Sequence, residues 1–146
     1  MRANEILLEL GDAIYPYTQV GNKLVATLRD GRVLDLAFWR TGTELEIIFG
    51  VNDETEMTGG GDQFKIMATV IDMITQHLGA ASEQRTPNRK PITTVYFTAA
   101  ANERSRVKYY TRRLVPVVTQ ALRAEDPSWT FSTDLVDGQQ AFIWRR

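Results

Sequence analysis

Residues 56–64, Glu-Met-Thr-Gly-Gly-Gly-Asp-Gln-Phe, contain residue types that can hold an anion. They lead directly into a run with helical apolar spacing, over residues 62–78. The first turn of a helix exposes four unpaired N–H groups and the positive end of the helix dipole, and glycines in front of it let a phosphate approach the backbone. Asp62 is also a good N-cap, and its carboxylate would compete with an anion for the same N–H groups. The loop either binds a phosphate or only turns the chain.

Two common phosphate-binding motifs do not fit this loop. A Walker loop continues with Gly-Lys-Ser or Gly-Lys-Thr, whereas Asp62 and Gln63 follow the glycines here. The glycine spacing also differs from that of the dinucleotide-binding fingerprint. Only the glycines themselves and their place before a helix make the loop a candidate anion site.

The composition limits other chemistry. The chain has no cysteine, which excludes disulfides, zinc–thiolate sites and a cysteine nucleophile. Its single histidine, His77, lies near the end of the predicted helix, where a cation favours the helix dipole, and we give it no catalytic role. With no other His or Cys, we expect no transition-metal site.

The charge balance gives little reason to expect a nucleic-acid or membrane partner. Lys and Arg number 17 against 18 Asp and Glu, a formal net charge of −1. Five basic residues fall around a predicted helix rather than along one stripe, which is typical of a solvated face: Arg104, Arg106, Lys108, Arg112 and Arg113. No run approaches a membrane span, and acids interrupt the apolar N-terminal run, unlike in a signal peptide. We expect a cytoplasmic protein.

The length of 146 residues suits one domain, residues 1–146, with one core. Apolar spacing predicts helices over residues 3–13, 62–78 and 102–124, strands over residues 23–28, 32–38, 45–51, 92–98, 129–135 and 140–144, and irregular connectors over residues 11–21 and 80–91. The predicted order is α-β-β-β-α-β-α-β-β. That order is typical of an α/β (α+β) fold, with a mixed sheet of about six strands and helices on both faces.

Glycine and proline predict the breaks between these elements. Two Asp-Gly pairs, at positions 30–31 and 137–138, are strong hairpin signals because both positions of such a turn need positive φ. Gly79 is placed to end the helix over residues 62–78. Pro116 lies inside the last predicted helix and should kink or split it.

Two segments together resemble the GCN5-related N-acetyltransferase superfamily. That superfamily carries a Gln/Arg-x-x-Gly-x-Gly/Ala loop between its fourth strand and third helix, where backbone amides hold the pyrophosphate of acetyl-CoA. Residues 56–61 match this loop at Gly59 and Gly61, with Glu56 in place of the usual Gln or Arg. The three glycines are thus in a loop where the superfamily binds its cofactor.

The second segment resembles the next strand and helix of the superfamily, an apolar strand followed by Asn-x-x-Ala-x-x-Leu-Tyr. Here residues 94–98 lead through Asn102 into a helix with Tyr109 and Tyr110. Helical spacing favours Tyr110, which shares a stripe with Val107 and Leu114. The closing hairpin also fits the last two strands of the superfamily. The residue pattern of the chain further resembles that of small bacteriophage-encoded proteins of this fold.

The resemblance implies roles for individual residues. The strand over residues 45–51 would splay from its neighbour and hydrogen-bond the pantetheine arm of acetyl-CoA. The implied cofactor-binding residues are Thr58, Gly59, Gly60, Gly61, Asp62, Gln63 and Asn102. Tyr110 would protonate the leaving thiolate, or it is a packed core tyrosine. The base that the attacking amine needs would be Glu46, Asp53 or Glu54.

Two functions follow from these residues. The first is a divergent, phage-encoded, acyl-CoA-dependent N-acyltransferase. The second is a catalytically inactive relative of that fold, which acts as a virion structural protein or binds a host factor. Asp62 and Glu56 favour the second, whereas the Gly59/Gly61 spacing and Tyr110 favour the first. A protein partner or a homo-oligomer is compatible with both.

Overall fold

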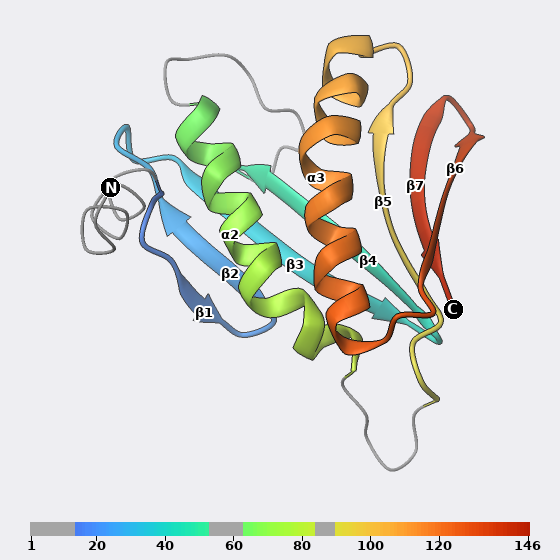
Figure 1. Ribbon diagram of the computed structural model, residues 1–146. Coiled ribbons are helices and arrows are strands. Elements are labelled where there is room, and N and C mark those ends of the chain that lie inside the picture. Colours follow the sequence, from blue (N-terminus) through green and yellow to red (C-terminus); the bar gives the residue numbers. More distant parts are fainter. Residues whose placement is uncertain (1–13, 53–62, 84–89) are drawn as a thin grey trace, which may run out of the picture. The chain divides into compact units, whose positions relative to one another are not determined.

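The computed structural model describes residues 14–52, 63–83 and 90–146 (Figure 1). These residues form an α+β fold with seven strands and two helices. The elements are β1 (Thr18–Val20), β2 (Lys23–Thr27), β3 (Val33–Thr41), β4 (Glu44–Val51), α2 (Gln63–Ser82), β5 (Thr94–Ala100), α3 (Arg104–Glu125), β6 (Thr130–Val136) and β7 (Gln139–Arg145).

The strands form one mixed sheet in the order β1-β2-β3-β4-β5-β7-β6. β4 and β5 are parallel, which is possible because α2 and its flanking connections supply the long crossover that a parallel pair needs. The pairs β1–β2, β2–β3, β5–β7 and β7–β6 are antiparallel. The predicted mixed sheet is therefore confirmed.

The predicted order of elements is wrong at its beginning. β1 lies in the stretch over residues 11–21, which we expected to be irregular, and it makes the number of strands seven rather than six. Its three residues pair with β2 across a turn of only Gly21 and Asn22, with Val20 opposite Lys23. All three are exposed, so the strand carries no alternating apolar signal. The predicted helix over residues 3–13 lies outside the described residues.

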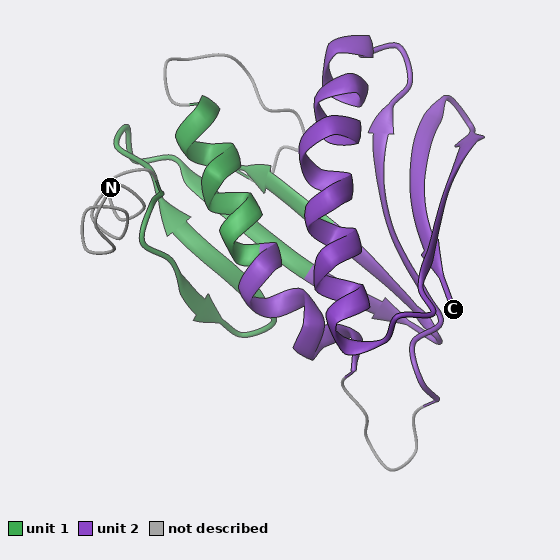
Figure 2. Ribbon diagram, viewed as in Figure 1, with its two compact units in different colours: residues 1–37, 48–73 green, residues 38–47, 74–146 purple. Residues whose placement is uncertain are grey.

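The described chain divides into two compact units (Figure 2). Unit 1 takes the described residues of the ranges 1–37 and 48–73, and unit 2 takes those of the ranges 38–47 and 74–146. The chain of β3, β4 and α2 passes through both units. Assignment of residues 1–146 to a single domain stays a prediction.

Unit 1 contains the β2–β3 hairpin, whose turn differs from the predicted one. Gly31 N–H donates to Leu28 C=O at 3.1 Å, and Leu28 N–H donates to Arg32 C=O at 2.8 Å. This pattern is a three-residue loop that ends in a left-handed residue, Gly31, with φ of 84°. Only the glycine has positive φ; Asp30 instead accepts the N–H of Arg32 with its carboxylate, at 3.1 Å.

Hydrogen bonds in unit 1 join the chain before β1 to the first half of α2. Tyr15 N–H donates to Thr69 Oγ1 at 2.9 Å, and the Tyr17 hydroxyl donates to Asp72 Oδ2 at 2.8 Å. The Lys65 ammonium lies 4.4 Å from the centre of the Tyr15 ring, in cation–π geometry. These contacts give a buried threonine and an acidic helix residue their polar partners.

Unit 2 has an aromatic core between α3 and the strands β5 and β7. The buried stripe of α3 is Tyr110, Leu114, Val118 and Leu122, as the helical spacing predicts. On the strands, the Phe97 ring stacks on Phe142 at 4.7 Å and lies 5.8 Å from Trp144. Trp144 Nε1–H donates to Thr119 Oγ1 at 2.9 Å, so this buried indole has its polar partner on the helix.

Gly79 does not end α2, contrary to the prediction, because the helix continues to Ser82. A Cβ at Gly79 would lie 3.2 Å from Glu125 Oε1 and 3.3 Å from its Cγ, with Ala121 C=O at 3.6 Å. The glycine thus allows the end of α2 to approach the end of α3 closely. Glycine is needed here because it has no side chain to clash with α3, not because of its backbone freedom.

Pro116 does not split α3, which runs as one helix from Arg104 to Glu125. Proline has no N–H to donate to the carbonyl four residues earlier, that of Arg112. Four buried residues on one stripe of the helix offset this loss, because packing supplies most of a helix's stability in a protein.

The first prediction concerns this proline. Pro116→Ala restores the missing backbone donor at an exposed position, so we expect the free energy of unfolding to rise by about 2 kcal/mol. This is less than the full difference in helix propensity between proline and alanine, because the unfolded chain also becomes more flexible. Chemical denaturation measures the change. Gln120→Ala, at another exposed position of α3, is the control and should change the free energy of unfolding by no more than a few tenths of a kcal/mol. A fall in stability for Pro116→Ala would contradict the prediction.

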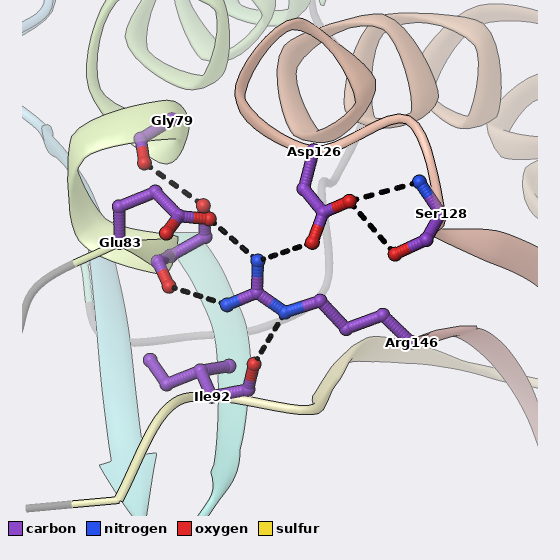
Figure 3. A network of polar contacts seen from close by, with 7 residues as sticks. Gly79, Glu83, Ile92, Asp126, Ser128 and Arg146 are labelled. Atoms are coloured by element: carbon purple, nitrogen blue, oxygen red, sulfur yellow. Dashed lines mark hydrogen bonds and ion pairs between the residues drawn. The ribbon is translucent and has the colours of Figure 1, made fainter.

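Arg146 joins the ends of several elements of unit 2 (Figure 3). Its Nη1 lies 2.6 Å from Glu83 Oε1 and 3.1 Å from Asp126 Oδ2, while its Nε–H donates to Ile92 C=O at 2.8 Å. The guanidinium also lies 4.5 Å from the centre of the buried Trp129 ring. With its side chain only 10% exposed, this cation is largely removed from water and depends on these partners.

The second prediction tests this cluster. Arg146→Ala leaves Glu83 and Asp126 without their cation and uncovers Trp129, so we expect a loss of about 3 kcal/mol in the free energy of unfolding. Arg146→Lys should recover only part of it, because an ammonium lacks the fork that reaches several acceptors. The matched control is Arg145→Ala, since the neighbouring exposed arginine should contribute less than about 0.5 kcal/mol. Equal losses for both alanine variants, measured at low micromolar protein, would refute the special role of Arg146.

Candidate functional site

The predicted pyrophosphate loop lies almost entirely outside the described residues. This holds for Thr58, Gly59, Gly60, Gly61 and Asp62. The last member, Gln63, is the exposed first residue of α2, and the first turn of that helix carries no acidic side chain. The described end of the loop therefore leads directly to the helix terminus, where an anion would meet unpaired N–H groups. Phosphate binding here stays a prediction.

Asn102 is exposed in the tight turn between β5 and α3. Ala101 N–H donates to Gly138 C=O at 2.9 Å, and Glu103 N–H donates to Ala100 C=O at 3.0 Å. Glu103 is the N-cap residue of α3, without a side-chain cap. Asn102 thus precedes the helix by two residues, and its proposed part in cofactor binding stays a prediction.

Tyr110 lies on the buried stripe of α3, with only 4% of the residue exposed. Its ring meets the Phe97 ring edge-on, with centroids 5.8 Å apart. Burial is the main cause that raises the pKa of the phenol, since a phenolate would lose its hydration. The hydroxyl is therefore neutral at physiological pH, as a proton donor must be, but it is set in a packed core.

Glu46 lies on β4 and is half-buried. The Tyr96 hydroxyl, from β5, donates to Glu46 Oε1 at 3.2 Å. Burial first, and then the charge and hydrogen bond of Glu46, raise the pKa of Tyr96 above its ordinary value. Glu46, one of the bases that the sequence predicts, thus already accepts a hydrogen bond from Tyr96.

The structure does not bring Glu46 and Tyr110 together. Consecutive side chains of a strand point to opposite faces of the sheet. On β5, Tyr96 contacts Glu46, whereas the next residue, Phe97, contacts Tyr110. Glu46 and Tyr110 therefore lie on opposite faces of the sheet in unit 2, and they cannot act as base and acid on one reacting centre in this arrangement.

The parallel ladder between β4 and β5 is short. Its three pairs are Glu44–Thr94, Leu45–Val95 and Glu46–Tyr96. β5 continues beyond them to Ala100. Every second residue of a strand turns its N–H and C=O to the same neighbour, and Thr94 N–H donates to Thr43 C=O at 3.3 Å. Thr93 N–H donates to the same carbonyl at 2.9 Å, and the three pairs of the ladder all lie within unit 2.

Sequence reasoning missed two aromatic residues of unit 2. Tyr96 was read only as part of a strand, because its contact with Glu46 depends on the parallel register of β4 and β5, which no local pattern encodes. Trp39, on β3, is 53% exposed. Trp129 and Trp144 are buried, and no local pattern in the sequence separates the one exposed tryptophan from these two. An exposed tryptophan is the kind of side chain that protein interfaces use.

Comparisons with known proteins give the chain no relatives. No protein-family model matches it, and neither the curated proteins nor the solved structures contain a match. Across residues 14–52, 63–83 and 90–146, no three His, Asp or Glu side chains gather as a metal site would require. No helix within the described part is both long and apolar enough to cross a membrane. Function has to be argued from the geometry.

The third prediction concerns the Glu46–Tyr96 pair. Glu46→Gln removes the negative charge, so the pKa of Tyr96 should fall but stay above the ordinary pKa of tyrosine, because burial is the larger cause. Because the pKa of Tyr96 is higher in the folded than in the unfolded chain, its contribution to stability is fully present at a pH below the unfolded pKa. This contribution is lost as the pH rises through the folded pKa. Tyrosine ring NMR signals followed against pH measure the shift, with Tyr96→Phe for assignment.

Glu44→Gln is the control for that titration. Glu44 acts on Tyr96 only through its charge, the smallest of the four causes, so its removal should lower the pKa of Tyr96 by less than Glu46→Gln does. An equal effect of the two substitutions, or none, would contradict the contact between Glu46 and Tyr96.

Proposed function

We propose that the protein is a divergent N-acyltransferase of the GCN5-related fold that binds an acyl-CoA thioester and transfers its acyl group to an amine. The observation that carries this proposal is the parallel β4–β5 pair, which joins the strand that precedes the glycine loop to the strand that precedes α3 and Tyr110. The resemblance implies that the β4 backbone hydrogen-bonds the amides of a pantetheine arm, which can bind in the manner of a short added strand.

The order of elements supports the same proposal. The additional strand β1 makes β4 the fourth strand of the described chain, and the glycine loop therefore follows a fourth strand, as in the superfamily. α3, with Tyr110, follows β5, and the β6–β7 hairpin closes the chain. The expected fold also has helices on both faces of the sheet, and this arrangement is part of the proposal.

The proposed reaction is an acyl transfer from sulfur to nitrogen. The amine nitrogen attacks the thioester carbonyl, the carbon–sulfur bond breaks, and a proton must reach the departing thiolate. Tyr110 is neutral and is the proposed donor. The base is assigned to Asp53 or Glu54 rather than to Glu46, because Glu46 lies on the other face of the sheet from Tyr110 and holds Tyr96.

The fourth prediction is that the protein binds acetyl-CoA, measured by titration calorimetry. Gly61→Glu should abolish the binding heat without unfolding the domain, because it places a carboxylate and a side chain where pyrophosphate would approach. The matched control is Gln76→Glu, which adds the same charge at an exposed position later in α2 and should leave binding unchanged. Absence of binding to the wild-type protein at millimolar acetyl-CoA would refute the proposed function.

Catalysis is tested separately from binding. Tyr110→Phe keeps the ring against Phe97, so it should lower turnover by at least about tenfold while changing the affinity for acetyl-CoA by less than about twofold. Equal turnover of the two proteins would remove Tyr110 from the mechanism while leaving the binding proposal intact.

A non-catalytic role is the second candidate, either in a virion or against a host factor. The burial of Tyr110 in the aromatic core favours it, because an acid that must meet a thiolate gains nothing from a packed environment. The exposed ring of Trp39 is the kind of side chain that protein interfaces use. A folded protein that gives no heat with acetyl-CoA decides for this candidate.

A further inference from the structure

β6 is an outer strand of unit 2 and carries exposed apolar residues. It pairs with β7 and has no second neighbour in the strand order of the described chain (Figure 1). Leu135 is 64% exposed and Val136 is 49% exposed. Natural proteins protect such edges with charged side chains, above all lysine, with proline or with a bulge. Residues 130–136 contain no lysine or proline, carry Asp134 as their one charge, and pair with β7 in continuous register.

We propose that this edge pairs with the β6 strand of a second copy of the chain, in an antiparallel dimer with its twofold axis at Thr133. The inference is independent of the acyltransferase proposal, because it uses only β6 and its neighbour β7. It commits to a second copy because the sequence of β6 is complementary to itself when it is reversed about Thr133.

The backbone fixes which residues can pair across this edge. The β6–β7 turn is two residues long, Asp137 and Gly138, both with positive φ, and its flanking pair is Val136–Gln139. In such a hairpin the flanking pair is hydrogen-bonded and the pairing then alternates. Even-numbered residues of β6 therefore bond to β7, while Phe131, Thr133 and Leu135 turn their N–H and C=O outward.

The register centred on Thr133 pairs these outward residues with one another. Thr133 meets the Thr133 of the second copy, and Phe131 meets Leu135 twice, which gives about six interchain hydrogen bonds. It is the register in which all seven residues of β6 overlap. The cross-strand pair of Phe131 and Leu135 is apolar, and it would cover a leucine that is now exposed.

Charge complementarity supports the same register on the other face of the strand. There Ser132 lies opposite Asp134 of the second copy. Arg145, on β7, reaches Ser132 with its Nη1 at 3.4 Å from Oγ. The Asp134 carboxylate of the second copy would therefore approach this guanidinium, and the twofold axis repeats the ion pair.

Pairing exchanges one hydrogen bond within the chain. Asp134 Oδ1 now accepts the outward N–H of Leu135 at 2.9 Å. In the dimer this N–H donates to Phe131 C=O of the second copy, which releases the Asp134 carboxylate for Ser132 and Arg145 across the axis. The exchanged bond is exposed, so replacing it costs little.

The fifth prediction is a dimer of the full chain, measured by sedimentation equilibrium from micromolar to millimolar protein. Thr133→Pro removes an outward N–H but no bond to β7, so the dimer Kd should rise at least tenfold. Thr133→Val keeps the N–H and is the control, with a Kd within about threefold of wild type. Circular dichroism checks that both variants are folded. A chain that stays monomeric throughout this range would overturn the proposal.

A single cysteine tests the axis directly, because the natural chain has none. Thr133→Cys places two thiols on the axis, where the Cα atoms of a hydrogen-bonded pair lie about 5.5 Å apart, within the range of a disulfide. Oxidation should cross-link this variant, whereas Leu135→Cys alone should not cross-link. Cross-linking of Leu135→Cys but not of Thr133→Cys, or a dimer unaffected by Thr133→Pro, would show a different interface and overturn the proposal.

Discussion

The alternation of side chains along β5 is the constraint on which the candidate site depends. Tyr96 and Phe97 are consecutive, yet one holds Glu46 and the other packs on Tyr110. Any chemistry built around Tyr110 has to draw its other groups from the α3 face of unit 2 or from segments that reach it. The same constraint gives Glu46 a partner in Tyr96 and thus a structural role of its own.

The sequence allowed most of the fold to be predicted, because long elements repeat their apolar signal several times. The stripe of α3 recurs over four buried residues, and β5 alternates as a buried strand should. The failures were short or competing signals. β1 has three exposed residues, Gly79 looked like a helix end but provides space beside Glu125, and Pro116 was outweighed by the packing around it.

The candidate site was less accessible to sequence reasoning than the fold. A motif can place Tyr110 on a helix and Glu46 on a strand, but it cannot say which face of the sheet each reaches. That depends on the register of a parallel pair whose strands are separated by more than forty residues in the chain. The Arg146 cluster was invisible for the same reason, since its partners Glu83, Ile92 and Asp126 are distant in sequence.

The backbone of β6 is the basis of the proposed dimer, and it is separate from the residues of the proposed acyltransferase site. Its outward N–H and C=O groups lie along a whole edge, beside phenylalanine and leucine, which suits another strand. Because β7 separates β5 from β6, a second copy on β6 would leave β5 and the contact between Tyr96 and Glu46 untouched. Backbone groups of a strand need partners, and a second β6 strand can supply them to this edge of the described part of unit 2.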